Sequence, residues 1–211
     1  MENKYELTDE VIEYLGHTLH RIKALKDFGD IKKGDMGGWI EGSFNLSQYG
    51  DCWVYQGAIA YDNSRVLNNS KIYDNAQIYG NAWIWENAKV YGNARVGGYT
   101  MIFGKVNVCD DALVCGDSII TDEAKICGKI TISNNPMING NPIISKIGDY
   151  AVFQDIWGNG DYITWTKSNN MWKEGSFYGT EEELIKKSYK VGKNKGKRIE
   201  KLINFIKDYY V

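Results

Sequence analysis

Proline, cysteine and histidine are scarce in this chain, which has 2 Pro, 4 Cys and 2 His among its 211 residues. No run of about 18 apolar residues occurs, so we expect no transmembrane helix and no membrane partner. Four cysteines in a chain of this length do not resemble a disulfide framework. Segment 1–14 is acidic and lacks an apolar core, so we expect no signal peptide and a soluble, cytoplasmic protein.

What the chain has instead is glycine, aromatic residues and a repeat. It carries 23 Gly, and 13% of its residues are aromatic, which excludes a disordered chain. From residue 45 to residue 146 it divides into 17 blocks of six without an insertion. The fourth position is Ile, Val or Ala in 16 blocks, with Gln48 the exception. The second position is Ala, Ser, Thr or Cys in 12 blocks, and the sixth is Gly, Asp or Asn in 14.

This pattern predicts a triangular β-solenoid. Side chains alternate along a strand, so the second and fourth positions point to the same side, which we take as the core. The sixth and first positions form a corner, because Gly, Asn and Asp tolerate left-handed backbone angles. Three walls close a coil of 18 residues, and 17 walls give nearly six coils. We expect a mainly β fold with a β cap at residues 1–44, the β-helix at 45–146 and a small α+β domain at 147–211.

The repeat resembles the hexapeptide-repeat family, whose fold is a left-handed parallel β-helix shaped as a triangular prism. The resemblance implies two kinds of enzyme. Trimeric acyltransferases of the family typically use a histidine base, and its carbonic-anhydrase-like members bind zinc through three coil histidines. Here the two histidines, His17 and His20, precede the coils, and we interpret both as ordinary strand residues. We therefore expect neither enzyme activity, and no metal or cofactor.

A narrower resemblance covers the flanks of the repeat. The run KALKDFGDIKKGDMGGWIEGSFNLS at residues 23–47, followed by hexads of the YGNA type, resembles short hexapeptide-repeat proteins of phages and prophages. The similarity extends to ITWTKSNNMWKEGSFYGTEEELIKK at residues 163–187. That family carries no enzymatic motif that can be transferred onto this chain. The resemblance implies an accessory role in a phage and names no ligand.

Aromatic residues occupy the fifth position in eight of the first ten hexads. Residues 18 apart stack on one wall, so we expect three outward ladders. The ladders are Tyr55 with Tyr73 and Tyr91, Tyr61 with Tyr79, and Tyr49 with Trp85 and Phe103. Such ladders fit strand stacking, the subunit interface of a homotrimer or a ligand platform. A monomer that left all of them open would expose an apolar patch larger than soluble proteins usually have. The candidate interface residues are Tyr55, Tyr61, Tyr73, Tyr79, Trp85, Tyr91 and Phe103, and Trp53 and Trp83 at the third position add further outward bulk.

The cysteines follow the same geometry. Cys109 and Cys127 lie one coil apart and should be stacked neighbours, Cys115 lies on the next wall, and Cys52 points inward. A metal site needs more converging ligands than these. We interpret the cysteines as small side chains in a ladder.

The segments outside the repeat predict a cap and a second unit. Residues 5–10 and 17–25 read as two strands around a turn at 15–16, and Trp39 and Ile40 are suited to plug the first coil. Residues 151–157, 162–168 and 171–179 read as three strands, with turns at 158–161 and 168–170. Thr180 and Glu183 form a capping box that opens a helix to about residue 189. A flexible linker at 191–197 and an amphipathic helix from 199 to 210 follow.

Two groups of residues in the C-terminal unit are candidates for binding. A hairpin concentrates aromatic rings with ammonium, hydroxyl and amide groups, which suits a base-plus-phosphate ligand. Its residues are Trp165, Lys167, Ser168, Asn169, Asn170, Trp172 and Lys173. The alternative is a hairpin with a polar turn and core tryptophans. Residues 186–211 hold nine Lys or Arg against two acids, which fits either a phosphate-rich partner or a solvated helix face.

Together these features predict a non-enzymatic, phage-derived binding protein on an oligomeric β-helix scaffold. One role in keeping with the phage resemblance is counter-defence, by sequestering a host nucleotide signal or a host immune protein. Net charge −2 gives no argument for nucleic acid as partner. Two alternatives stay open, an acyltransferase with an atypical catalytic base and a structural component of the virion.

Overall fold

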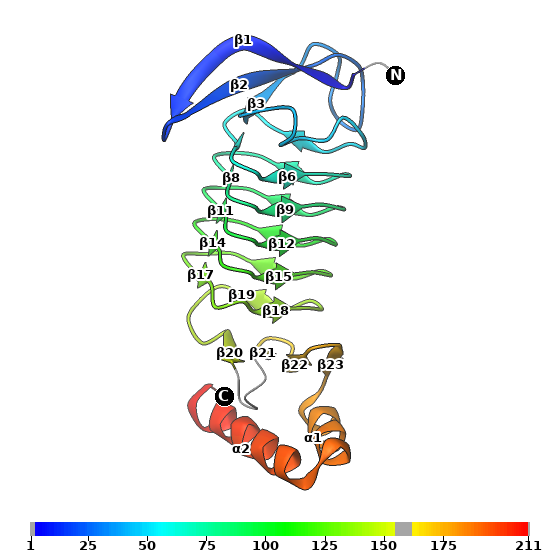
Figure 1. Cartoon of the computed structure of the whole chain (residues 1–211), viewed down its shortest axis with the longest axis vertical. Helices are drawn as coiled ribbons and strands as arrows, with labels where there is room; N and C mark the ends of the chain where they lie inside the picture. Colours follow the sequence, from blue (N-terminus) through cyan, green and yellow to red (C-terminus); the bar gives the residue numbers. More distant parts are fainter. Residues whose placement is uncertain (1–2, 155–161, 211) are drawn as a thin grey trace.

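In the computed structural model the chain forms one elongated stack of an N-terminal β cap, a parallel β-solenoid and a small C-terminal sheet with two helices (Figure 1). The structure describes residues 3–154 and 162–210. The predicted mainly β fold with a parallel β-helix is confirmed. Neither helix in these described residues is long and apolar enough to cross a membrane.

The cap is a three-stranded sheet that continues into the solenoid. Strands β1 (Tyr5–Tyr14) and β2 (His17–Ala24) form an antiparallel hairpin around the predicted turn at residues 15–16. Strand β3 (Met36–Ile40) pairs antiparallel with β2 and parallel with the coil strand β5. Ile40 is fully buried in the solenoid core, as predicted for a plug. Trp39 does not enter that core, because alternation along β3 turns it to the other face, where it packs with Leu19, Ile59 and Tyr61.

Gln48, the one departure from the fourth-position pattern, pairs with the cap. Its Oε1 accepts from the backbone N–H of Lys4 at 2.7 Å and of Tyr5 at 3.3 Å. Its Nε2 donates to the carbonyl oxygen of Tyr5 at 3.2 Å. The side-chain amide thus supplies the hydrogen bonds that a neighbouring strand would give to the start of β1, and it replaces an aliphatic core residue for that reason.

Each coil gives one two-residue strand to each of three parallel sheets, and each strand pairs with the strand 18 residues later, as in Lys89↔Asn107. The first wall consists of β4 (Trp53–Val54), β7 (Lys71–Ile72), β10 (Lys89–Val90), β13 (Asn107–Val108), β16 (Lys125–Ile126) and β19 (Ile143–Ile144). The second wall continues the cap sheet with β5 (Ile59–Ala60), β8 (Gln77–Ile78), β11 (Arg95–Val96), β14 (Leu113–Val114) and β17 (Thr131–Ile132). The third wall consists of β6 (Arg65–Val66), β9 (Trp83–Ile84), β12 (Met101–Ile102), β15 (Ile119–Ile120) and β18 (Met137–Ile138).

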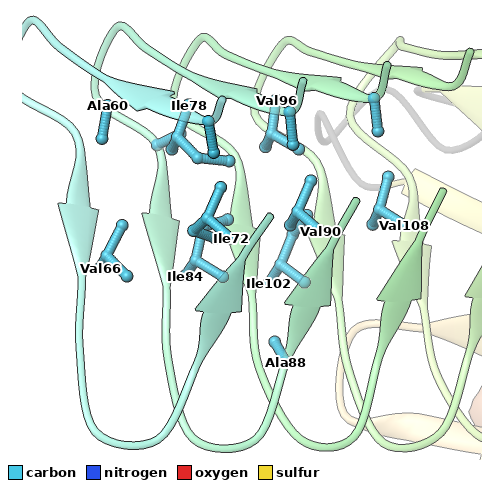
Figure 2. Close-up of a cluster of buried hydrophobic side chains, with 14 of the residues drawn as sticks. Ala60, Val66, Ile72, Ile78, Ile84, Ala88, Val90, Val96, Ile102 and Val108 are labelled. Carbon is cyan, nitrogen blue, oxygen red and sulfur yellow. The ribbon is translucent and has the colours of Figure 1, made fainter. Parts of the chain in front are cut away.

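The interior and the corners follow the hexad positions. Fourth-position side chains such as Ile84 and Val90 point into the prism and are fully buried (Figure 2). At the corners, Asp62 and Asn68 have φ of 54° and 57°. At Gly104, with φ of +85°, a Cβ would lie 2.5 Å from the carbonyl oxygen of Asp122. The enrichment of Gly, Asn and Asp therefore reflects left-handed corners where successive coils approach closely.

Trp53 leaves the first wall on its outer side, but the expectation that it adds exposed aromatic bulk there is wrong. Its side chain is 1% exposed, because the cap covers the first coil. The ring lies edge-on to Phe28 at 5.3 Å and to Tyr5 at 6.1 Å between centroids. Trp83, one wall away and not covered by the cap, is 47% exposed as predicted.

The predicted positions of the cysteines are correct, but one pair predicted as free side chains in a ladder forms a disulfide. Cys109 and Cys127 are stacked neighbours on the first wall, with their Cα atoms 4.6 Å apart. At that separation a disulfide can close, and the structure joins the two residues by one. Cys52 is buried and free, and Cys115 is half-buried and free.

The C-terminal unit contains a four-stranded antiparallel sheet. Its strands are β20 (Tyr150–Gln154), β21 (Tyr162–Thr166), β22 (Met171–Glu174) and β23 (Phe177–Gly179). Residues 171–179 are thus a hairpin and not the single predicted strand, because Gly175 takes φ of +53° and turns the chain. The end of the predicted strand at 151–157 and the predicted turn at 158–161 lie outside the described residues.

Two helices pack against this sheet. Helix α1 (Glu181–Val191) opens at the predicted capping box, in which the backbone N–H of Glu183 donates to Thr180 and that of Thr180 donates to Glu183. Helix α2 (Lys193–Tyr210) begins earlier than predicted, so the expected flexible linker at 191–197 is wrong. Gly196 lies so close to α1 that a Cβ there would be 2.4 Å from the Tyr189 ring. This contact fixes a segment that looks like a linker by composition.

Candidate functional site

The predicted hairpin site divides into core and turn. Trp165 and Trp172 are each 1% exposed and pack with Leu184, Ile199 and Ile203 in the core of the C-terminal unit. The two indole rings are therefore not available as an open stacking platform. This placement corresponds to the alternative of core tryptophans below a polar turn.

The polar residues of that turn have structural partners. Ser168 Oγ accepts from the backbone N–H of Ile143 at 2.7 Å, which ties the hairpin to the last coil. Asn169 Oδ1 accepts from the Thr166 hydroxyl at 2.5 Å, and Asn170 Oδ1 accepts from Trp165 Nε1 at 3.0 Å.

The two lysines of the predicted site lie in different surroundings. Lys167 is exposed, and its Nζ donates to the carbonyl oxygen of Tyr210 at the end of α2. Lys173 is half-buried, and this burial lowers the pKa of its ammonium group. The seven predicted residues therefore lie in different surroundings, and four of them, Trp165, Lys167, Asn170 and Trp172, line a common pocket.

The expected aromatic ladders form on all three walls. Tyr73 and Tyr91 stack on the first wall with centroids 5.0 Å apart and an interplanar angle of 4°. Tyr61 and Tyr79 stack on the second wall at 5.7 Å, and Trp85 and Phe103 on the third at 4.5 Å.

At the end nearest the cap, the second and third ladders lie in different environments. Tyr61 is only 6% exposed, because Tyr14 and His17 of the cap cover it. Tyr49 is 70% exposed, and Leu67 separates it from Trp85, so it does not extend the third ladder. Strand stacking therefore accounts for the ladder cores, and a homotrimer interface stays a prediction.

The first ladder changes geometry where it meets the cap. Tyr55 turns its edge to Tyr73, with centroids 5.9 Å apart and planes at 79°. Its hydroxyl donates to both carboxylate oxygens of Asp30 in the cap loop, at 2.8 and 3.0 Å. Lys71 is ion-paired with the same carboxylate. The cap loop thus holds Tyr55 out of the parallel stack that Tyr73 and Tyr91 form.

Two adjoining hollows of about 630 and 290 Å³ lie at this point, and we call them together the cap cleft. They share Asp30, Tyr55 and Tyr73. The larger side also has Ile31, Asp35, Met36, Trp53, Gln56 and Asp74, and the smaller side has Lys71 and Lys89. The Tyr55–Tyr73 pair therefore separates an acidic side from a basic side.

The charged groups of the cap cleft differ in whether they already have a partner. The hydrogen bond from Lys71 lowers the pKa of Asp30, which keeps that carboxylate ionised. Burial raises the pKa of Tyr73, so its ring stays neutral. Lys89 is exposed and has no hydrogen-bond or ion-pair partner among residues 3–154 and 162–210. An anion entering the basic side thus meets one free ammonium group and one that is shared with Asp30.

Sequence reasoning missed the cap cleft although its components are visible in the sequence. The acidic loop DFGDIKKGD spans residues 27–35, and lysine recurs at the third hexad position at Lys71, Lys89 and Lys125. The 18-residue period places these lysines on one wall. Nothing in the repeat predicts that the loop at residues 27–35 folds over the first wall.

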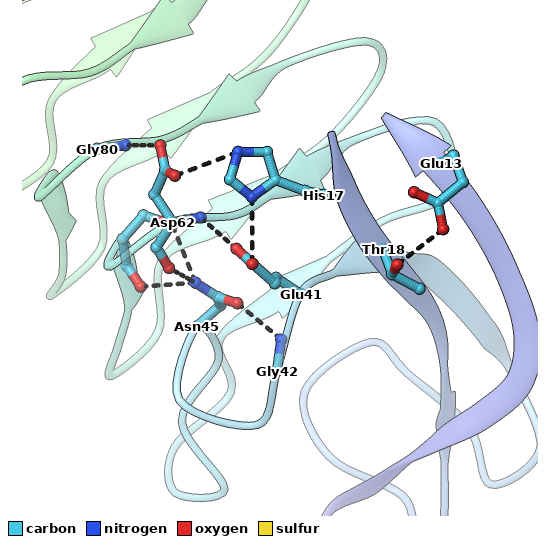
Figure 3. A network of polar contacts seen from close by, with 9 residues as sticks. Glu13, His17, Thr18, Glu41, Gly42, Asn45, Asp62 and Gly80 are labelled. Atoms are coloured by element: carbon cyan, nitrogen blue, oxygen red, sulfur yellow. Dashed lines mark hydrogen bonds and ion pairs between the residues drawn. The ribbon is translucent and has the colours of Figure 1, made fainter. Parts of the chain in front are cut away.

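His17 lies in a polar network where the cap meets the second wall (Figure 3). Its Nδ1 is 3.1 Å from Glu41 Oε1, and its Nε2 is 3.4 Å from Asp62 Oδ1. Asp62 Oδ2 also accepts from the backbone N–H of Gly80 at 2.9 Å. The interpretation of His17 as an ordinary strand residue is therefore incomplete, since it links the cap hairpin to the first coils.

The same three side chains, and the group Cys109, Asp110 and Cys127, have ligand atoms within 4.8 Å of one another. A metal at His17 would need the carboxylates on the same side as one ring nitrogen. Here they face opposite nitrogens, which suits a protonated imidazole between two acids. In the other group the disulfide occupies both sulfur atoms. Neither group is arranged as a metal site among the described residues.

This network predicts a pH-dependent contribution to stability. The hydrogen bond to Glu41 raises the pKa of His17 above its ordinary value. The contribution is therefore complete below the unfolded pKa of about 6.5 and is lost as the pH rises through the higher folded pKa. We expect the difference in melting temperature between the unsubstituted chain and His17→Gln to shrink between about pH 6 and pH 9. A difference that is constant with pH, or equal to that of His20→Gln, would contradict this.

No family model matches the chain. A segment of 54 residues is 41% identical to the "Uncharacterized acetyltransferase YdcK" of Escherichia coli (strain K12), and it covers 25% of this chain. The match spans only 17% of the length of that relative. The similarity and the β-solenoid both fit a hexapeptide-repeat protein, and neither supports a relationship to phages.

Proposed function

We propose that this chain is a binding protein whose cap cleft takes a nucleotide-type ligand. The observation that carries the proposal is the break in the first ladder. Tyr73 has a parallel partner, Tyr91, on one side and only the edge of Tyr55 on the other. A planar base that takes the place of the Tyr55 edge would continue the stack, and base–aromatic stacking is a general source of affinity for nucleotides.

The charges around this position complement the two ends of a nucleotide. Asp35 and Asp74 on the larger side accept hydrogen bonds from the amino groups of a base. Lys71 and Lys89 on the smaller side attract a phosphate. Sequestration of a host nucleotide signal, the role that the sequence suggests, is one use of such a site.

Calorimetric titration with nucleoside monophosphates, cyclic mononucleotides and cyclic dinucleotides tests the proposal. We expect heat with at least one member of the panel, and affinity that falls as salt rises. Lys89→Gln should weaken binding, whereas Lys125→Gln, on the same wall two coils further along, should not. If no nucleotide of the panel gives heat of binding or raises the melting temperature of the protein, the proposal is wrong.

Acyl transfer is a second candidate, which the similarity to YdcK favours. His17 is the histidine that carboxylates orient, as a general base requires. Its geometry opposes the role, because Nε2 faces Asp62 at 3.4 Å and not an open approach for a substrate. We expect no release of CoA from acetyl-CoA with sugar or amine acceptors. Turnover that His17→Asn abolishes and His20→Asn preserves would favour the enzyme instead.

A further inference from the structure

The C-terminal unit lies at the far end of the solenoid from the cap (Figure 1). It contains a pocket of about 300 Å³. The pocket lies between the β21–β22 hairpin and helix α2, and we call it the hairpin pocket. Trp165, Ile203 and Ile206 contribute to its lining and are each at most 2% exposed. The inner part of the pocket is therefore apolar, as in most sites for small organic molecules.

A residue that lines this pocket has a buried polar atom without a partner among the described residues. Trp172 lines the pocket and is 1% exposed, and its Nε1 is buried without an acceptor among the described residues. Trp165, its neighbour in the same pocket, donates its own Nε1 to Asn170 Oδ1 at 3.0 Å. Buried N–H groups are nearly always paired, because an unpaired one keeps the full cost of its desolvation. The Trp172 indole N–H therefore lacks the acceptor that a buried donor requires, as far as residues 3–154 and 162–210 are concerned.

The rim of the pocket carries more donors than acceptors. Lys207 and Lys167 both line it, and the Asn170 amide adds N–H donors. Glu181 is the carboxylate in the lining, and Lys207 already binds it at 2.6 Å. Lys207 stays 48% exposed, so its remaining donors are free for a second acceptor. An entering ligand therefore meets positive charge at the rim and an apolar wall behind it.

We propose that the hairpin pocket binds a small aromatic carboxylate that carries an oxygen on its ring. The carboxylate lies at the rim between Lys167 and Lys207, the ring lies against Trp165 and Ile206, and the ring oxygen accepts from Trp172 Nε1. The volume is near the lower end for small-molecule sites, which favours a single-ring acid over a nucleotide. This site and its ligand class are independent of the cap cleft.

The indole N–H resonances of the ¹⁵N-labelled full chain test this proposal. Benzyl alcohol, benzoate and 4-hydroxybenzoate are titrated, and Trp172→Phe assigns the resonance of Trp172. We expect 4-hydroxybenzoate to bind best, because it has both a carboxylate and an oxygen on the ring. Benzyl alcohol has neither group and should bind worst. The Trp172 N–H resonance should move downfield with 4-hydroxybenzoate alone. Trp172→Phe should lower the affinity for 4-hydroxybenzoate about tenfold and leave that for benzoate unchanged.

A charge variant separates a built site from loose binding to an apolar surface. Lys207→Gln should weaken both carboxylates at least fivefold, whereas Lys201→Gln, on α2 outside the pocket, should change neither. Lys207 is half exposed, so its replacement leaves the fold intact. The proposal is overturned if 4-hydroxybenzoate at millimolar concentration does not shift the Trp172 resonance, if benzoate shifts it equally, or if benzyl alcohol binds as well as 4-hydroxybenzoate.

Discussion

Replacing Tyr73 by leucine is expected to lower the affinity of the cap cleft for its nucleotide by about 10- to 100-fold, since stacking on one aromatic ring contributes roughly 1–3 kcal/mol per base. Leucine keeps an apolar side chain beside Tyr91 but offers no flat face for a base. Tyr73 is half-buried and lies outside the prism core, so the coil should keep its fold. Calorimetry with the tightest nucleotide of the panel measures the loss.

Tyr79→Leu is the matched control. Tyr79 occupies the same hexad position on the second wall and stacks on Tyr61 at 5.7 Å, away from the cap cleft. We expect this variant to bind as tightly as the unsubstituted chain while losing a similar stacking contact. Equal losses in the two variants would show that stacking supports the fold and not a ligand. Undiminished binding by Tyr73→Leu would place the ligand elsewhere.

Replacing Gly38 by alanine should detach the cap from the first coil. A Cβ at Gly38 would lie 2.3 Å from the carbonyl oxygen of Ala58 and 2.4 Å from that of Tyr55. Both are backbone atoms of the coil, so β3 has to move as a whole. We expect a loss of about 3 kcal/mol in unfolding free energy, at the upper end for overpacking, read from urea denaturation.

Because Tyr55 lines the cap cleft, this variant should also lose nucleotide binding. Gly192→Ala is its control. Gly192 joins the two helices with φ of 168°, extended backbone that any residue adopts, and nothing lies within 4 Å of a Cβ there. We expect the control to change stability by less than about 0.5 kcal/mol. A Gly38→Ala chain as stable as the control would mean that the cap is not seated on the coil.

Much of the solenoid is predictable because its determinants are local and repeated. The aliphatic fourth position, the small second position and the Gly, Asn or Asp corner each act within six residues, and every coil repeats them. Stacking of Tyr73 on Tyr91 follows from the 18-residue period alone. Gln48 shows the limit of this logic, because its amide pairs with β1, a strand more than 40 residues earlier.

The errors share one cause, which is packing between segments that are distant in sequence. Trp53 reads as an outward residue until the cap covers it. The lysine-rich segment at 191–197 reads as a linker until Gly196 packs on Tyr189. The hairpin tryptophans look like an exposed stacking platform until Leu184 and Ile203 of the two helices bury them.

The sequence by itself determined that this chain folds as a parallel β-helix of 18-residue coils, because each wall is specified by the alternation and corner preferences of its own six residues. Only the tertiary structure decided where the chain has clefts. Asp30 meets Tyr55 and Lys71 because the cap loop folds back over the first wall, and Lys207 meets Trp172 because α2 docks on the hairpin. Such meetings depend on contacts between remote segments, which no local pattern of side chains encodes.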